Sequence, residues 1–314
     1  MKRNYDLNGL ALKHGFNTKE MEKVCRISDI IEDISAVKFL SDRLSLYGGT
    51  AFTFIYSPEI LRLSVDIDFN YRHIDTVDWG DTRKEIDQKI KNLLDKQGYH
   101  KTNITINASY PLTRFTIKYE NTLSLEDQFK IEIGYMRRTP ILKNDVIADF
   151  KHIGTQETFK TTTPIKEELF ANKWCALLYR KTPRDLFDTY RITQTEFDRN
   201  IFRKCAIIDS LTRGKPKLYT IDPNSIRNIR IDTSLTNLLQ TQKLQKINFA
   251  EITTHVTEFT KTQIMNLTQN ETTAIDQFID QKTFNPALID ETEVFNEKIN
   301  QYPPALWKLE NPTS

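Results

Sequence analysis

Two stretches of alternating polar and apolar residues constrain the fold of this chain more than any other feature. In residues 62–69, the polar positions are Arg62, Ser64, Asp66 and Asp68. In residues 128–136, apolar side chains at Phe129, Ile131, Ile133 and Tyr135 alternate with Lys130, Glu132 and Gly134. Because successive side chains of a β-strand point to opposite faces, each stretch predicts a strand with one buried face.

The rest of the chain divides into a mixed part and a helical part. Residues 103–107 and 112–119 predict further strands, and residues 17–44 and 82–97 show the spacing of amphipathic helices. After about residue 164, helical spacing dominates. We therefore predict an α+β protein with two lobes, a mixed-sheet lobe over residues 1–160 and a mostly helical lobe over residues 161–314.

Composition limits the class of protein. The chain has 314 residues, 39% hydrophobic and 27% charged, which is typical of soluble globular proteins. No stretch approaches the roughly 18 apolar residues that a transmembrane helix needs, and the first residues lack the apolar core of a signal peptide. We therefore expect a cytoplasmic protein. The three cysteines lie far apart, so Cys25 and Cys175 are predicted to be buried free thiols.

Charge is unevenly distributed. Residues 199–246 contain ten Lys and Arg against three Asp, a balance of +7, whereas residues 251–314 contain four Lys against ten acids, a balance of −6. The basic segment could bind nucleic acid, with Arg227 and Arg230 as candidate contacts. A solvated surface with a fortuitous asymmetry explains the same numbers, and both interpretations stay open.

The pair Asp66 and Asp68 is the first feature that indicates chemistry. Two residues apart on a strand, both carboxylates would point the same way, roughly 7 Å apart. They repel each other, and a divalent cation such as Mg²⁺ or Mn²⁺ would remove that repulsion while gaining oxygen ligands. An edge strand with a solvated acidic face is the alternative.

Two further features complete a candidate site. Gly48, Gly49 and Thr50 lie between a short extended run and a predicted helix, where the backbone could approach a phosphate. Glu132 would add a third carboxylate if its strand lies beside the first. Three carboxylates can hold two metal ions for displacement at phosphorus. Each feature also has a structural explanation: an ordinary turn, or the polar face of a solvated strand.

Together these features resemble the nucleotidyltransferase signature of the DNA polymerase β-like superfamily. The runs Leu46-Tyr47-Gly48-Gly49-Thr50-Ala51-Phe52 and Arg62-Leu63-Ser64-Val65-Asp66-Ile67-Asp68-Phe69 are similar to those of its AbiEii/MenT branch. That branch consists of toxins of type IV toxin–antitoxin and abortive-infection systems. The terminal run Tyr302-Pro303-Pro304-Ala305-Leu306-Trp307 resembles the same branch.

A second block strengthens the resemblance. It comprises Glu168, Lys173 and Arg180 on a predicted helix over residues 166–181, followed by Arg184-Asp185-Leu186-Phe187-Asp188. Thr182 and Pro183 predict the start of the next helix, where Asp185 could simply act in capping. The resemblance implies that Lys173 binds the nucleoside triphosphate and that Asp185 or Asp188 positions the nucleotide or Lys173.

The resemblance implies a reaction and partners. We expect a metal-dependent transfer of a nucleoside monophosphate from an NTP to an acceptor hydroxyl, with RNA, above all the 3′ end of tRNA, as the acceptor. Arg62, on the same predicted strand face as the carboxylates, could hold a phosphate, or it could be a charge partner of Asp66 or Asp68 with no role towards the substrate. A cognate antitoxin protein would be a partner. Two alternatives stay open: a same-fold transferase with a small-molecule acceptor, and a non-catalytic nucleotide-binding protein.

Overall fold

The computed structural model describes residues 2–74, 78–290 and 292–312. The chain forms two compact units. The first comprises Met1–Arg138, Val146–Thr163 and Asn237–Lys246. The second comprises Thr139–Asp145, Pro164–Thr236 and Ile247–Ser314. The chain therefore leaves the first unit and returns to it twice.

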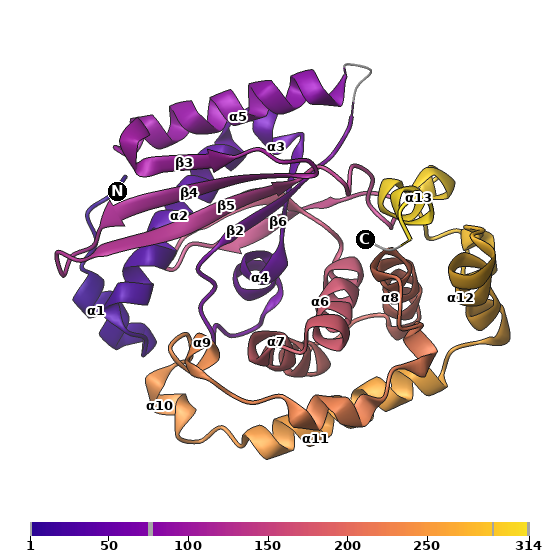
Figure 1. The fold of residues 1–314 in the computed structure, drawn as a ribbon. Helices are drawn as coiled ribbons and strands as arrows, with labels where there is room; N and C mark the ends of the chain where they lie inside the picture. The colour runs from indigo at the N-terminus through magenta and orange to yellow at the C-terminus, as the bar shows by residue number, and fades with distance from the viewer. Residues whose placement is uncertain (1, 75–77, 291, 313–314) are drawn as a thin grey trace. The chain divides into compact units, whose positions relative to one another are not determined.

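A five-stranded sheet forms the centre of the first unit (Figure 1). Its order is β1-β2-β5-β4-β3. The strands are β1 (Leu44–Tyr47), β2 (Ile67–Tyr71), β3 (Ile104–Asn107), β4 (Leu112–Glu120) and β5 (Glu126–Gly134). The pair β2 and β5 is parallel, whereas the other neighbouring strands are antiparallel. The predicted mixed sheet and α+β class are therefore confirmed.

The two faces of this sheet differ sharply in polarity. One face is apolar, and Phe115, Ile131 and Ile133 on it are fully buried. Helices α2 (Thr18–Ala36) and α5 (Trp79–Lys96) contribute to that core, and Figure 1 shows α5 running along the sheet. The opposite face carries the polar residues of the same strands. The alternation in the sequence therefore indicated which side chains are buried.

Several helix starts follow from local sequence. The Asn17 side chain accepts a hydrogen bond from the Glu20 backbone N–H at 2.8 Å and so caps α2, as predicted. The short helix α4 (Gly48–Ala51) continues as a π-helical turn, η1 (Phe52–Tyr56). The remaining helices of this unit are α1 (Leu7–His14), α3 (Lys38–Ser41), the 3₁₀ turn η2 (Lys101–Asn103) and α10 (Thr241–Leu244).

The predicted strand over residues 62–69 is partly wrong. Only its end belongs to the sheet, because β2 begins at Ile67. The preceding residues pair instead with a distant segment: the Leu63 N–H donates to the Leu238 carbonyl at 2.8 Å, and Arg62 forms an isolated bridge with Leu239. These long-range backbone hydrogen bonds replace sheet pairing for residues 62 and 63.

A two-stranded ribbon was missing from the sequence prediction. It consists of β6 (Val146–Lys151) and β7 (Thr158–Thr163), which pair antiparallel. The Thr163 hydroxyl donates to the Leu46 carbonyl at 3.0 Å, which ties β7 to β1. Both strands lack the regular polar and apolar alternation on which the prediction relied, although β7 is rich in β-branched threonine.

The second unit is helical. Helix α6 (Lys166–Arg180) places Trp174 in its core, where the ring packs near Phe202 and Phe259. The other elements are α7 (Pro183–Thr193), α8 (Arg199–Arg213), η3 (Leu218–Thr220), η4 (Pro223–Asn228), α9 (Thr233–Thr236), α11 (Phe249–Met265), α12 (Gln269–Gln281), η5 (Pro286–Leu288), η6 (Ile299–Gln301) and α13 (Pro303–Glu310).

Two smaller predictions can also be compared with the structure. Cys25 and Cys175 are buried free thiols, as predicted, and Cys205 is a third. Within residues 2–74, 78–290 and 292–312, no helix has the length and apolar character that crossing a membrane requires.

Candidate active site

Four side-chain positions line up across the polar face of the sheet. Tyr47 on β1 is the register partner of Asp68 on β2, and Asp68 is the partner of Glu132 on β5. Glu132 is in turn the partner of Arg114 on β4. Partners in neighbouring strands point to the same face, and neighbouring strands lie about 4.8 Å apart. Asp68 and Glu132 therefore project side by side from one face.

The turn formed by Gly48 and Gly49 lies directly against the Asp68 carboxylate of this row of side chains. Gly48 has φ +69°, a left-handed backbone conformation that side chains disfavour. A Cβ at Gly48 would also fall on the carboxylate of Asp68. The position therefore needs glycine for two separate reasons. The first turn of α4, which contains Gly49, consequently begins against the Asp68 carboxylate.

A hydrogen bond from the Thr50 side chain to the Asp66 backbone joins these two residues. The Thr50 hydroxyl is fully buried, donates to the Asp66 carbonyl and lies 3.0 Å from the Ser64 hydroxyl. Thr50 thereby anchors the bend that carries Asp66, immediately before β2. Burial raises the pKa of the nearby Glu20 carboxyl, and the negative charge of Asp66 contributes to the same shift.

Arg114 is a member of the row that sequence reasoning missed. Its Nε donates to Glu132 Oε1 at 2.6 Å, while its side chain remains 42% exposed. The sequence placed it at a polar position of an alternating strand, which was the available signal. Its proximity to Glu132 depends on the register between β4 and β5, which one sequence does not reveal.

Arg62 lies in a different environment from the one predicted. The prediction placed its side chain on the same strand face as Asp66 and Asp68, but Arg62 precedes β2 by five residues. The residue is only 5% exposed, and its Nη1 donates to the Leu63 carbonyl at 2.7 Å. A shared strand face therefore no longer supports a role for Arg62 beside the carboxylates.

The second unit contains Lys173 on α6 and Asp188 on α7. The Lys173 ammonium lies 3.1 Å from Asp188 Oδ2, and both residues are buried. Glu168, also on α6, has a structural contact: its carboxylate accepts the backbone N–H groups of Ile141 and Leu142 at 2.9 and 3.1 Å. Of the two acids for which the resemblance implied a positioning role, Asp185 and Asp188, it is Asp188 that contacts Lys173.

Asp185 forms a separate cluster at the start of α7. Arg180 donates to both of its carboxylate oxygens, at 2.8 and 3.2 Å, in a bidentate geometry. The Thr182 side chain accepts the Asp185 N–H at 3.3 Å and caps the helix, as predicted. Helix capping and the ion pair with Arg180 therefore account for the observed contacts of Asp185.

Part of the basic segment 199–246 is paired with acids within the chain. Arg203 forms an ion pair with Glu271, Lys204 with Asp290, and Lys217 with Asp276 and Asp280. The acids of these pairs all come from the acidic C-terminal segment. These pairs account for part of the charge asymmetry of the sequence. Arg227 and Arg230 are exposed and have no acid within ion-pair distance among the described residues.

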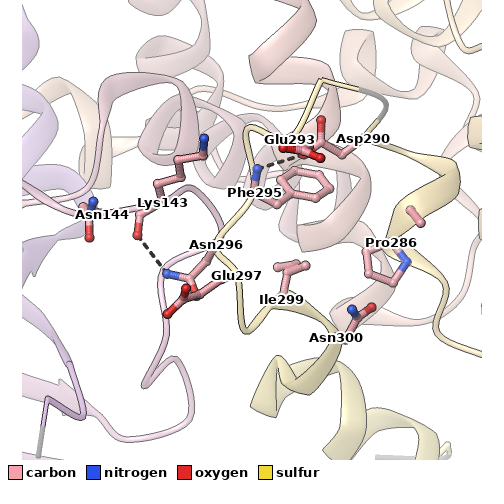
Figure 2. A pocket seen from close by; sticks show the side chains of 11 residues that line it. Lys143, Asn144, Pro286, Asp290, Glu293, Phe295, Asn296, Glu297, Ile299 and Asn300 are labelled. Carbon is pink, nitrogen blue, oxygen red and sulfur yellow. Dashed lines mark hydrogen bonds between the residues drawn. The ribbon is translucent and has the colours of Figure 1, made fainter.

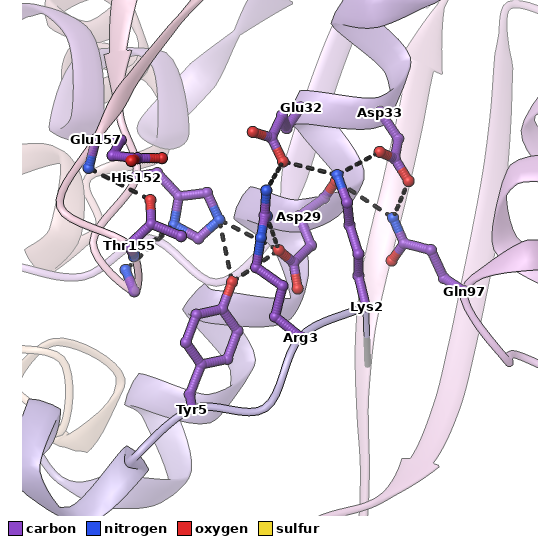
Figure 3. Close-up of polar contacts among 11 residues, drawn as sticks. Lys2, Arg3, Tyr5, Asp29, Glu32, Asp33, Gln97, His152, Thr155 and Glu157 are labelled. Atoms are coloured by element: carbon purple, nitrogen blue, oxygen red, sulfur yellow. Dashed lines mark hydrogen bonds and ion pairs between the residues drawn. The ribbon is translucent and has the colours of Figure 1, made fainter.

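A second cluster of possible metal ligands lies in the first unit (Figure 3). Asp29, Glu32 and His152 place one ligand atom each within 4.8 Å of one another. Arg3 already bonds both carboxylates, and Tyr5 donates to Asp29 at 2.7 Å. His152 Nδ1 accepts the Gly154 and Thr155 N–H groups, which leaves the proton on Nε2, the atom nearest Asp29. This cluster is therefore a buried polar network rather than a ready metal site.

A cavity of about 680 Å³ lies in the second unit (Figure 2). Its lining includes the carboxylates Asp290, Glu293 and Glu297 and one lysine, Lys143. None of the predicted site residues lines it.

The comparison with known families assigns the chain to a class of protein, the nucleotidyltransferases. Residues 30–281 match the family described as nucleotidyl transferase AbiEii toxin of type IV toxin–antitoxin systems. The match covers most of the chain, which therefore belongs to this family. The predicted family and the prediction of a nucleotidyltransferase enzyme are thus confirmed. Membership implies a nucleotide substrate and an antitoxin partner.

A solved structure has the same overall fold. MenT4, a nucleotidyltransferase toxin from Mycobacterium tuberculosis H37Rv, superposes with a TM-score of 0.63 at 15% sequence identity. The similarity covers 98% of this chain and 99% of that one. At this identity the likeness supports the fold alone. The comparison with curated proteins gives no match.

Proposed function

We propose that this enzyme transfers a nucleoside monophosphate from an NTP to the 3′ hydroxyl of tRNA. The single observation that carries the proposal is the register of Asp68 with Glu132, beside a glycine turn that admits no side chain. In the reaction, the acceptor hydroxyl loses its proton and its oxygen forms a bond to the α-phosphorus. The bond from that phosphorus to the β-phosphate oxygen breaks, and pyrophosphate leaves.

Asp66, Asp68 and Glu132 are the proposed metal ligands. Asp68 and Glu132 share one sheet face and Asp66 lies on the bend just before β2, and carboxylate oxygens suit a hard divalent cation such as Mg²⁺ or Mn²⁺. A bound ion would supply charge neutralisation at the reacting phosphate. Glu132 either completes this ligand set or accepts the acceptor proton. If Glu132→Gln removes an acidic limb from the pH–rate profile, the proton-accepting role is supported.

The other proposed nucleotide contacts come from two parts of the sequence. Gly48, Gly49 and Thr50 would offer backbone N–H groups to the triphosphate, while the buried Thr50 hydroxyl, which donates to the Asp66 carbonyl, would hold the Asp66 segment in place. Lys173, Asp185 and Asp188 keep the nucleotide roles that the family implies, and Arg62 is retained as a weaker candidate. Arg227 and Arg230 are proposed RNA contacts. A cytoplasmic location would give the enzyme access to both NTP and tRNA.

The test is label transfer from each α-³²P-NTP to total tRNA with Mg²⁺, in wild type and Asp68→Ala. Label on tRNA in the wild type alone would support the reaction and identify the donor. Label on a small molecule instead would favour the same-fold transferase with a different acceptor. Tight NTP binding without transfer to any acceptor would favour a nucleotide-binding protein.

A further inference from the structure

The polar face of the sheet continues beyond the carboxylates as a partly exposed surface on β3, β4 and β5. Arg114 is the register partner of Asn107, and Thr116 is the partner of both Thr105 and Lys130. These five residues form two adjacent rows on the face that carries Glu132. We call them the acceptor face: Thr105, Asn107, Arg114, Thr116 and Lys130.

Charge and hydrogen-bonding capacity define what could bind there. Among the described residues, Glu132 is the one acid within ion-pair distance of Arg114, and Lys130 has none. Thr105 and Asn107 are exposed and add hydroxyl and amide groups. The acceptor face itself contains no carboxylate. Two cations surrounded by short polar side chains suit the phosphates of a nucleic-acid backbone.

Position relates this surface to the chemistry. Arg114 lies beside Glu132, and Lys130 precedes Ile131, whose register partner Ile67 follows Asp66. Arg114 is therefore the register partner of one proposed catalytic carboxylate, Glu132, and Lys130 lies two residues before Glu132 on β5, on the same face of the sheet. A chain whose phosphates contact Arg114 and Lys130 would bring its terminal hydroxyl close to that row. The absence of aromatic residues from these five positions predicts binding without base stacking.

We propose that the acceptor face binds the single-stranded 3′ end of the RNA acceptor through its phosphates, with Arg114 and Lys130 as the contacts. This proposal rests on the proposed function, because it takes the carboxylate row as the reaction centre. Arg114 also positions Glu132 through the hydrogen bond at 2.6 Å. Lys130 makes no such contact, so its effect reports on RNA binding alone.

The experiment measures binding of a short fluorescent single-stranded RNA without NTP, over a series of salt concentrations. The variants are Lys130→Gln, Arg114→Gln and the double variant. The control variant is Lys84→Gln/Lys89→Gln, which removes two cations from α5. Lys84 pairs with Asp81 and Lys89 with Glu85, as Arg114 pairs with Glu132. We expect the double variant to raise the Kd about tenfold or more. The slope of log Kd against log salt should fall by about 1.4, because each lost contact to a single strand removes about 0.7.

Transfer assays separate the acceptor from the donor. The double variant should raise KM for tRNA while KM for NTP stays within about twofold of wild type. An unchanged Kd and salt slope, or an equal loss in the α5 control, would overturn the acceptor face. Retained RNA binding with lost antitoxin binding would assign this face to a protein partner and also overturn it.

The two proposals can fail separately. If the wild type binds RNA through Arg114 and Lys130 but transfers nothing to it, the acceptor face stands and the proposed reaction fails. If transfer to tRNA occurs and is insensitive to both substitutions, the reaction stands and the acceptor face fails.

Discussion

The ammonium group of Lys173 lies 3.1 Å from the Asp188 carboxylate, and both side chains are more than nine-tenths buried. A buried charge that loses its partner is strongly destabilising, whereas replacing both members by apolar residues is often nearly neutral. We therefore expect Asp188→Ala to lower the free energy of unfolding by about 3–5 kcal/mol. The double variant Lys173→Met/Asp188→Leu should recover most of that loss in urea denaturation.

Asp185 provides the comparison for this ion pair. Its partner Arg180 is 59% exposed, so solvent can replace the lost contact. Asp185→Ala should therefore cost less, about 1 kcal/mol. The argument depends on the cation left behind, which is buried for Lys173 and exposed for Arg180. Equal losses in the free energy of unfolding for Asp188→Ala and Asp185→Ala would contradict it. Activity should be lost whenever Lys173 is replaced, even in the double variant whose stability recovers.

A second prediction concerns metal binding by the carboxylate row. In the wild type, added Mg²⁺ should raise the thermal unfolding midpoint, because a ligand that binds only the folded state stabilises it. Asp68→Asn and Glu132→Gln should reduce that shift and lower transfer by at least about 100-fold. Removal of the metal by EDTA should stop transfer. The control is Glu126→Gln, which changes an exposed acid on β5, the strand that carries Glu132, where Glu126 is paired with Lys118. A comparable loss of the Mg²⁺ effect and of transfer in this control would refute Asp68 and Glu132 as metal ligands.

Gly48 and Gly98 allow steric and conformational effects to be separated. Both have positive φ, +69° and +86°, but a Cβ at Gly98 meets nothing within 4 Å, whereas one at Gly48 meets Asp68. Alanine in the left-handed conformation costs about 1–2 kcal/mol at either position. We expect Gly98→Ala to lose stability and keep activity. Gly48→Ala should lose activity as well, measured as kcat for transfer at a temperature where both variants are folded.

Much of the sheet could be predicted from its alternating residues. Ile131 and Ile133 fix the buried face of β5, so Glu132 must point the other way. Its adjacency to Asp68 follows from strand order, which alternation does not specify. The resemblance to a known family supplied that relationship before the structure did. Arg114 had no such support, and only the register with β4 brings it to Glu132.

Other parts of the chain could not be predicted, for identifiable physical reasons. Residues 62–65 alternate like a strand, but Leu63 pairs with Leu238, far away in the sequence. The ion pairs between the basic segment and acids about 60 to 90 residues later, such as Lys204 with Asp290, were likewise not visible in the local sequence. In both cases the decisive interaction is long-range, and local pattern carries no information about it.

The buried network around Asp29 predicts a pH dependence of stability. Burial raises the pKa of Asp29, but hydrogen bonds from His152, Tyr5 and Arg3 outweigh it and hold the pKa below its ordinary value (Figure 3). A carboxyl with a lowered pKa contributes stability above its unfolded-state pKa of about 3.9, and that contribution is lost as the pH falls. Asp29→Asn should therefore cost about 3 kcal/mol at pH 7. In urea denaturation at a series of pH values, the difference in free energy of unfolding between the wild type and Asp29→Asn should become smaller below about pH 4.

Asp87 is the matched control, because its pKa shifts in the opposite direction. Burial raises the pKa of Asp87 above its ordinary value, against the opposing charges of Arg83 and Lys91. The wild type should therefore lose stability relative to Asp87→Asn as the pH rises from about 4 towards 7, the reverse of the Asp29 result. If both variants follow the same trend with pH, the individual carboxylates are not its source, and the network around Asp29 does not have the electrostatic role assigned to it.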